Sequence, residues 1–322
     1  MSTNLGAKLK QSFNKYASVI ILLALIGVCS LLSPAFLTGQ NIINITRQIS
    51  IVTILAFGET LLIIGGELDL SVGSVVGMTG VFAIIFYLAF HSLFLSLLLG
   101  LLLGGIVGVV NGFIVTRFHV PSFIVTLAMQ MVASGIIFLY TGGQNVYNIG
   151  SFTLFGQGNL ARVPIPTLFM IAIWLLSWLI LRKAKLGRYL YAIGGNVNAA
   201  RASGIEVNRV KMAAFVISGL LAGLSGVILM SRINAGMPGA GVGFELDALM
   251  AAIIGGTSFT GGIGTASGTL IGSFIIGILN NILILLGVQS YVQRILKGAL
   301  IIIAVAFDIQ SKMNRRIVRI LD

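Results

Sequence analysis

The sequence predicts an all-α polytopic membrane protein with about ten transmembrane helices. Three observations support this fold class. Hydrophobic residues make up 57% of the chain and charged residues only 9%, with a mean hydropathy of +1.07, whereas a soluble domain needs far more charge to cover its surface. Long runs carry no charge at all. No stretch shows the alternation of polar and apolar residues that is typical of a transmembrane barrel.

The individual helices follow from the length that a bilayer requires. A helix needs about 20 apolar residues to cross, so the longest charge-free runs have room for two crossings each. Those runs cover residues 70–116, 118–161, 163–181, 212–231 and 248–293. We therefore expect spans near residues 16–33, 42–65, 70–90, 93–116, 121–141, 165–182, 210–232, 246–257, 267–287 and 290–308.

The distribution of basic residues predicts the topology, because lysine and arginine gather on cytoplasmic flanks. Basic residues are concentrated in two tails, 1–15 and 311–322, and in the loop 183–209. We expect a cytoplasmic N-terminal tail (1–15), a transmembrane domain (16–310) and a basic cytoplasmic C-terminal tail (311–322). All but five of the twenty Lys and Arg then lie inside; the exceptions are Arg47, Arg162, Arg232, Arg294 and Lys297.

Several functional classes are excluded by what the sequence lacks. A net charge of +12 raises nucleic-acid binding as an alternative, but that function needs a basic face on a soluble fold. The single cysteine, Cys29, allows no internal disulfide or metal cluster. No G-x-x-x-x-G-K-[ST] phosphate-binding loop is present, and the histidines, His91 and His119, lie at loop ends. We expect no catalytic and no metal-binding residues.

Glycines mark two further features. Ile64-Gly65-Gly66 is echoed by Ile254-Gly255-Gly256, and weak internal symmetry of this kind is typical of transporters; chance similarity between glycine-rich segments is the alternative explanation. Small residues that recur every four positions predict close packing between helices in lipid. The longest such stripe consists of Gly100, Gly104, Gly108 and Gly112.

The polar insert 186–211 interrupts the apolar sequence in the middle of the chain. Asn196 or Asn198 can cap a helix N-terminus, residues 199–203 form the helix, and Gly204 provides a left-handed stop before Ile205. We also expect Asn208 to cap the following span. A short capped helix of this kind is suited to bind another protein, and an interfacial helix held by anionic lipids is an equally good explanation from composition alone.

The insert and several other motifs resemble the bacterial ABC-importer permeases of the ribose type. In the insert, the resemblance rests on the order Gly-Arg-Tyr, Gly-Gly-Asn, Ala-Ala and Ser-Gly-Ile. Elsewhere it rests on Leu68-Asp69-Leu70-Ser71-Val72-Gly73-Ser74, Phe244-Glu245-Leu246-Asp247-Ala248, Gly255-Gly256-Thr257-Ser258, Gly268-Thr269-Leu270-Ile271-Gly272 and Leu279-Asn280-Asn281. The similarity covers about residues 16–310 and is specific as a combination.

The resemblance implies a type II-like importer permease in the bacterial inner membrane, with a cytoplasmic coupling helix. Its implied partners are a second permease copy, an ABC ATPase that binds ATP and Mg, a periplasmic sugar-binding protein and membrane lipid, with no nucleic acid and no cofactor in this chain. It also implies that the coupling residues dock on the ATPase; they are Gly187, Arg188, Asn196, Ala199, Ala200, Arg201, Ser203, Gly204 and Ile205.

Polar residues in apolar surroundings are candidates for the solute path, because charged groups in a bilayer usually face a bundle interior or water. The candidates are Ser71, Asn111, Thr257, Asn280, Asn281 and Asp69. Hydrogen bonding between helices is the alternative role for the amides and hydroxyls. For Glu67, Asp69, Glu245 and Asp247 we favour helix capping. Glu59 differs because it lies inside an expected span.

Three functional hypotheses follow. The first is an ABC importer permease for ribose or a related pentose or hexose, driven through 186–211. The second is a permease of the same superfamily for another small solute, such as a branched-chain amino acid, a nucleoside or an autoinducer sugar. The third is a proton-coupled secondary transporter that uses Glu59 or Asp69 as a proton site. The sequence does not reveal which solute is carried.

Overall fold

The computed structural model describes the backbone of residues 3–321 and the side chains of residues 18–310. Each of the ten expected spans corresponds to a helix. These helices are α1 (Thr3–Leu32), α2 (Gly39–Ile64), α3 (Val72–Phe90), α4 (Leu93–Phe118), α5 (Ser122–Thr141), α7 (Ile165–Arg182), α10 (Val207–Ile233), α11 (Phe244–Ile254), α12 (Ala266–Leu285) and α13 (Ser290–Leu321).

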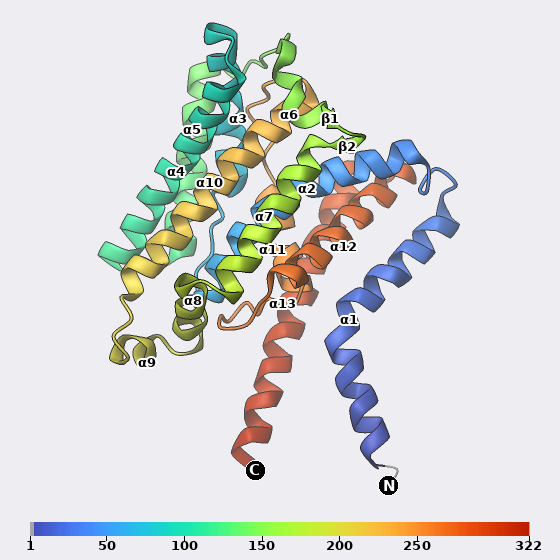
Figure 1. Cartoon of the computed structure of the whole chain (residues 1–322), viewed down its shortest axis with the longest axis vertical. Helices are drawn as coiled ribbons and strands as arrows, with labels where there is room; N and C mark the ends of the chain where they lie inside the picture. The colour runs from blue at the N-terminus through green and yellow to red at the C-terminus, as the bar shows by residue number, and fades with distance from the viewer. Residues whose placement is uncertain (1–2, 322) are drawn as a thin grey trace.

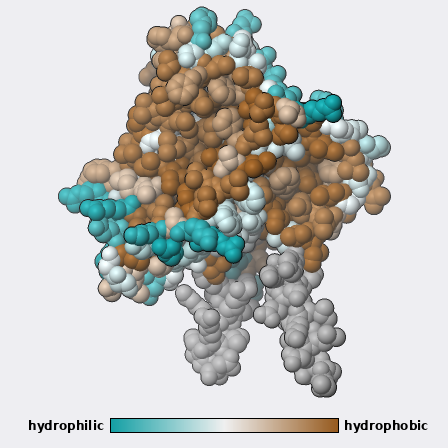
Figure 2. Space-filling model, in the orientation of Figure 1, coloured by the Kyte–Doolittle hydropathy of each residue, from teal (hydrophilic) through white to brown (hydrophobic). Residues whose placement is uncertain are grey.

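The all-α polytopic fold is confirmed. Among the described residues, seven helices are long and apolar enough to cross a membrane, and residues 18–32 of α1 add a shorter apolar stretch. The seven are α2, α3, α4, α5, α7, α10 and α12. Figure 2 shows the corresponding brown band of hydrophobic side chains, with hydrophilic residues gathered toward the ends of the molecule.

Helices α2, α3 and α10 form the centre of the bundle, and α4, α5 and α7 lie at its periphery (Figure 1). Helices α4 and α10 touch through backbone. A Cβ on Gly104 would overlap the carbonyl oxygen of Gly219, and a Cβ on Gly219 would overlap that of Gly104. The stripe of small residues on α4 is therefore a packing surface, since close approach replaces apolar burial as the force between helices in lipid.

The span expected at 246–257 is shorter than a bilayer crossing. Helix α11 has 11 residues, about 16 Å at 1.5 Å per residue, roughly half the hydrocarbon thickness. The preceding segment 235–243 is irregular and lies against α3, where a Cβ on Gly77 would meet the carbonyl oxygen of Pro238 and a Cβ on Gly241 would overlap that of Gly73. Irregular backbone is tolerated at this depth because protein covers it.

The loop between α5 and α7 folds into small elements: the 3₁₀ helix η1 (Gly150–Thr153), α6 (Leu154–Gln157), and an antiparallel pair, β1 (Asn159–Leu160) with β2 (Val163–Pro164). Arg47 of α2 donates to the Gln157 carbonyl at 2.6 Å. The opposite end of the bundle carries α8 (Lys185–Gly195) and α9 (Val197–Ala202). The first turns of α1 and the last of α13 lie toward this same end (Figure 1).

Of the expected tails, 1–15 and 311–322, residues 3–15 and 311–321 continue α1 and α13 in the backbone; the tail side chains, and residues 1–2 and 322 altogether, lie outside the described part of the chain.

Candidate functional site

The polar insert folds as two short helices joined at Asn196. The Asn196 side chain accepts hydrogen bonds from the backbone N–H groups of Asn198 (3.0 Å) and Ala199 (3.1 Å), so it caps α9 as predicted. At the other end, Gly204 has a φ of +81°, and the Ile205 N–H bonds to the Ala200 carbonyl at 3.1 Å. Local cap chemistry thus sets both ends of α9.

Helix α8 is a second feature of the insert, and the sequence reasoning missed it. Its buried side chains, Leu190 and Ile193, lie three positions apart and follow the half-buried Leu186. That spacing of three and four is the signal of one apolar helix face and could have revealed the helix. Asn208 was expected to cap the next span, which is wrong: Glu206 precedes α10, and Asn208 lies inside its first turn.

Helix α8 packs directly on the end of α2 and on the loop between α11 and α12. A Cβ on Gly194 would overlap the carbonyl oxygen of Ile64 and the backbone nitrogen of Gly262, two atoms that are joined by a hydrogen bond of 2.9 Å. The Tyr191 hydroxyl donates to the Gly264 carbonyl at 2.6 Å. Burial raises the pKa of the Tyr191 phenol, which keeps this donor protonated. Movement of α8 therefore acts on both segments at once.

One contacted segment contains the glycine motif Ile64-Gly65-Gly66, and the second motif, Ile254-Gly255-Gly256, comes just before the other contacted segment in the chain. After α2, the N–H groups of Gly65, Gly66 and Glu67 bond to the carbonyls of Leu61, Ile63 and Leu62; after α11, those of Gly255, Gly256 and Thr257 bond to Ala251, Ile253 and Ala252. Gly66 and Gly256 have φ values of +80° and +91°. The internal echo thus corresponds to two helix ends of the same geometry, and the end of α2 lies directly against α8.

The predicted docking residues divide by exposure. Gly187 and Ala200 are buried against the chain's own helices, and Ile205 is half-buried. A Cβ on Gly187 would overlap the backbone of α7, so this glycine positions α8. The remaining residues form the outward surface of the two helices, hereafter the α8–α9 surface: Arg188, Asn196, Ala199, Arg201, Ser203 and Gly204.

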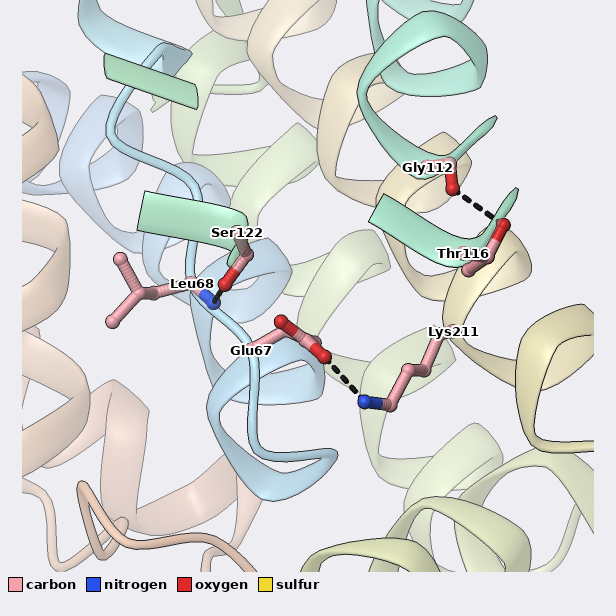
Figure 3. A network of polar contacts seen from close by, with 6 residues as sticks. All are labelled: Glu67, Leu68, Gly112, Thr116, Ser122 and Lys211. Carbon is pink, nitrogen blue, oxygen red and sulfur yellow. Dashed lines mark hydrogen bonds and ion pairs between the residues drawn. The ribbon is translucent and has the colours of Figure 1, made fainter. Parts of the chain in front are cut away.

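Polar contacts fix the loop that follows α2 (Figure 3). Glu67 forms an ion pair with Lys211 at the start of α10, and the Leu68 N–H donates to the Ser122 hydroxyl on α5 at 3.3 Å. Glu67 was expected to cap a helix; instead it joins this loop to α10, 144 positions away. No residue near Glu67 in the sequence indicates this partner.

Three of the solute-path candidates meet in one buried network. The Asn111 amide donates to the Ser71 hydroxyl at 3.0 Å, and Ser71 donates to Asp69 through both its hydroxyl and its backbone N–H. Glu59 is also buried, and its Oε2 accepts the Asp69 N–H at 3.4 Å. Asp69 therefore shapes the turn into α3, in line with the capping interpretation.

The other three candidates lie on α12 and in the loop before it. Asn280 donates to Asp247 at 3.3 Å, and Asp247 also pairs with Lys297 of α13 at 2.8 Å. Asp247 is thus an ion-pair partner rather than the cap that we expected. Asn281 exchanges hydrogen bonds with Asn41 of α2. The Thr257 hydroxyl is buried and has no hydrogen-bond partner in the described part of the chain.

Glu245 fits the capping expectation, since its carboxylate accepts the backbone N–H of Gly243, the residue that precedes α11, at 3.0 Å. Among the residues whose side chains are described, no group of three or more His, Cys, Asp or Glu could hold a metal ion.

Comparisons with known proteins identify the family. Residues 41–305 match the family described as branched-chain amino acid transport system / permease component. The chain is 43% identical to the ribose import permease of Escherichia coli, over 90% of this chain and 92% of that protein, and 42% identical to that of Bacillus subtilis, over 89% and 90%. The D-allose transport system permease of E. coli is 38% identical over 92% of each chain. No solved structure matches. The chain belongs to this family of transport-system permease components.

Proposed function

We propose that this protein is the permease subunit of an ABC importer for ribose or a related pentose or hexose. The related permeases are named for ribose and D-allose, and the L-arabinose permease of Azospirillum brasilense belongs to the same group of relatives. The observation that carries the mechanism is the packing of α8: Gly194 lies against the hydrogen-bonded pair Ile64, the last residue of α2, and Gly262, in the loop between α11 and α12.

In this proposal the α8–α9 surface docks on a separate ATPase, which binds ATP and Mg. Its arginines, Arg188 and Arg201, are exposed and have no carboxylate partner among the described residues, so they are free to pair with acidic groups of the ATPase. The caps at Asn196 and Gly204 keep α9 rigid. Closure of the ATPase then moves α8, and α8 displaces the end of α2 together with the loop between α11 and α12.

In the assembled transporter, two copies of the chain, both with cytoplasmic termini, receive the sugar from a periplasmic binding protein. Asp69, Ser71 and Asn111 belong to one candidate cluster, and Thr257, Asn280 and Asn281 complete the path. Three buried oxygens favour this role: the side-chain oxygens of Asn111 and Asn280 and the Thr257 hydroxyl have no partner in the described part of the chain. Sugar hydroxyls donate to acceptors of this kind.

The test is reconstitution of the permease in proteoliposomes with its ATPase and binding protein. We expect concentrative uptake of ribose or a related sugar that requires ATP and both partners. Uptake of leucine or a nucleoside in place of a sugar would replace the substrate assignment. Uptake by the permease alone, driven by a pH gradient, would contradict the whole proposal and favour proton coupling.

A further inference from the structure

A cavity of about 360 Å³ lies beside α8, at the end of the bundle opposite the β1–β2 hairpin. Its walls come from three elements that are far apart in the sequence: the end of α7, the middle of α8 and the first turn of α12 with the residue before it. The lining residues are Trp178, Leu181, Arg182, Tyr191, Thr265, Ala266 and Ser267. The cavity therefore lies between α7, α8 and the start of α12.

Arg182 gives the cavity its charge. Its guanidinium lies 5.5 Å from the centre of the Trp178 ring, a cation–π contact that orients the group without neutralising it. Among the described residues no carboxylate pairs with Arg182. Lys183, Lys185 and Arg188 follow closely, are exposed and have no acidic partner either. Such a concentration of unpaired cations attracts an anion.

The surroundings of Arg182 favour an amphipathic anion. On α7, Leu175 and Leu179 precede Arg182 by seven and three positions, so all three share one face of the helix. Both leucines are about half exposed, 47% and 48%, and lie in an apolar span. An acyl chain can follow this stripe while its headgroup reaches the guanidinium. A free phosphate would use the charge but not the stripe.

The first turn of α12 adds polar donors. The Thr265 hydroxyl accepts the Gly268 N–H at 3.0 Å, but the backbone N–H groups of Ala266 and Ser267 have no acceptor in the described part of the chain. Free N–H groups at a helix start favour phosphate oxygens. We propose that this cavity binds the phosphodiester headgroup of an anionic phospholipid of the inner leaflet, with its acyl chain along α7.

A lipid in this position would connect α7, α8 and α12. Tyr191 of α8 lines the cavity and also donates to the Gly264 carbonyl ahead of α12. A bound lipid would therefore hold α8 against the loop ahead of α12, which α8 displaces in the proposed mechanism. Lipid composition would then act on the same element that the ATPase drives.

The two tryptophans, Trp174 and Trp178, provide a direct assay. The Trp174 indole N–H has no hydrogen-bond partner in the described part of the chain, so Trp174→Phe removes none of the hydrogen bonds seen there and leaves Trp178 as the sole tryptophan. The full-length W174F protein is placed in phosphatidylcholine vesicles that contain a minority of either dibrominated phosphatidylglycerol or dibrominated phosphatidylcholine. We expect stronger quenching by the anionic lipid, with a preference of about fivefold, which corresponds to about 1 kcal/mol for one cation near a lipid surface.

Three variants in this background test the assignment. Arg182→Gln should abolish the preference, whereas Arg117→Gln, which removes an exposed arginine from the last turn of α4 instead of α7, should retain it. Arg182→Lys keeps the charge and should retain part of the preference, which guards against a folding defect in the glutamine variant. Equal quenching by both lipids, or an unchanged preference in R182Q, would overturn the proposal. Loss of quenching on adding inorganic phosphate, at an ionic strength matched with chloride, would assign the cavity to a soluble anion and overturn the lipid assignment.

Discussion

Replacing Gly194 with alanine tests whether movement of α8 is transmitted through its contact with Ile64 and Gly262. The new methyl group would overlap the Ile64 carbonyl oxygen and the Gly262 nitrogen, so either their 2.9 Å hydrogen bond breaks or α8 shifts. Overpacking of this kind costs about 1–3 kcal/mol, which corresponds to a factor of about 5–150 in the population of correctly seated α8. We therefore expect the amount of sugar imported per ATP hydrolysed to fall at least about fivefold.

The adjacent glycine is a matched control. A Cβ on Gly195 meets no atom within 4 Å, and alanine is intrinsically favoured over glycine in a helix at both positions. Uptake of labelled ribose and ATP hydrolysis are measured together in proteoliposomes that contain the ATPase and binding protein, after size-exclusion chromatography has shown that both variants are folded. The same import per ATP in Gly194→Ala and Gly195→Ala would refute the reasoning.

Three further predictions concern other contacts. Lys211→Met leaves the Glu67 carboxylate unpaired and should lower stability by about 1–3 kcal/mol, measured as a lower Tm in detergent. Lys211→Arg should preserve most of the wild-type stability, and an equal drop in Tm for the two variants would argue against the ion pair. Gly104→Ala should lower the Tm through overlap with α10, while Gly135→Ala, which has open space around its Cβ, should not; the prediction fails if both behave alike. Asn196→Ala removes the α9 cap, which is worth about 1 kcal/mol, so α9 amides should exchange hydrogen about fivefold faster; unchanged exchange would count against the cap, and Asn196→Ser should restore slow exchange.

Local chemistry explains most of what could be predicted from the sequence. The ends of α9 follow from Asn196 and Gly204, because cap residues act on backbone groups within four positions. The similarity between Ile64-Gly65-Gly66 and Ile254-Gly255-Gly256 was visible in the sequence for the same reason, because a glycine in the left-handed conformation commonly ends a helix. The seven described helices that can cross a membrane follow from apolar length, whereas the 11-residue α11 does not.

The features that escaped prediction depend on tertiary contacts. Helix α8 contains Gly187, Gly194 and Gly195, which lower its helix propensity, and it is stabilised by packing on α7 and on the end of α2. The ion pair between Asp247 and Lys297 joins residues 50 positions apart, and nothing near Asp247 distinguishes that role from capping. Partner choice among buried polar groups is set by the packed bundle rather than by neighbours in the sequence.

The central claim is that the ATPase docks on the α8–α9 surface. The most direct test is to determine which protein α9 contacts in the assembled transporter. Cys29 is the only cysteine and is buried, so Ala199→Cys in a Cys29→Ser background provides one exposed thiol on the α8–α9 surface. We predict that this thiol cross-links to the ATPase in the assembled transporter and reacts with an impermeant maleimide only when the cytoplasmic side is accessible. Labelling of the thiol from outside intact cells, with no cross-link to the ATPase, would contradict the account.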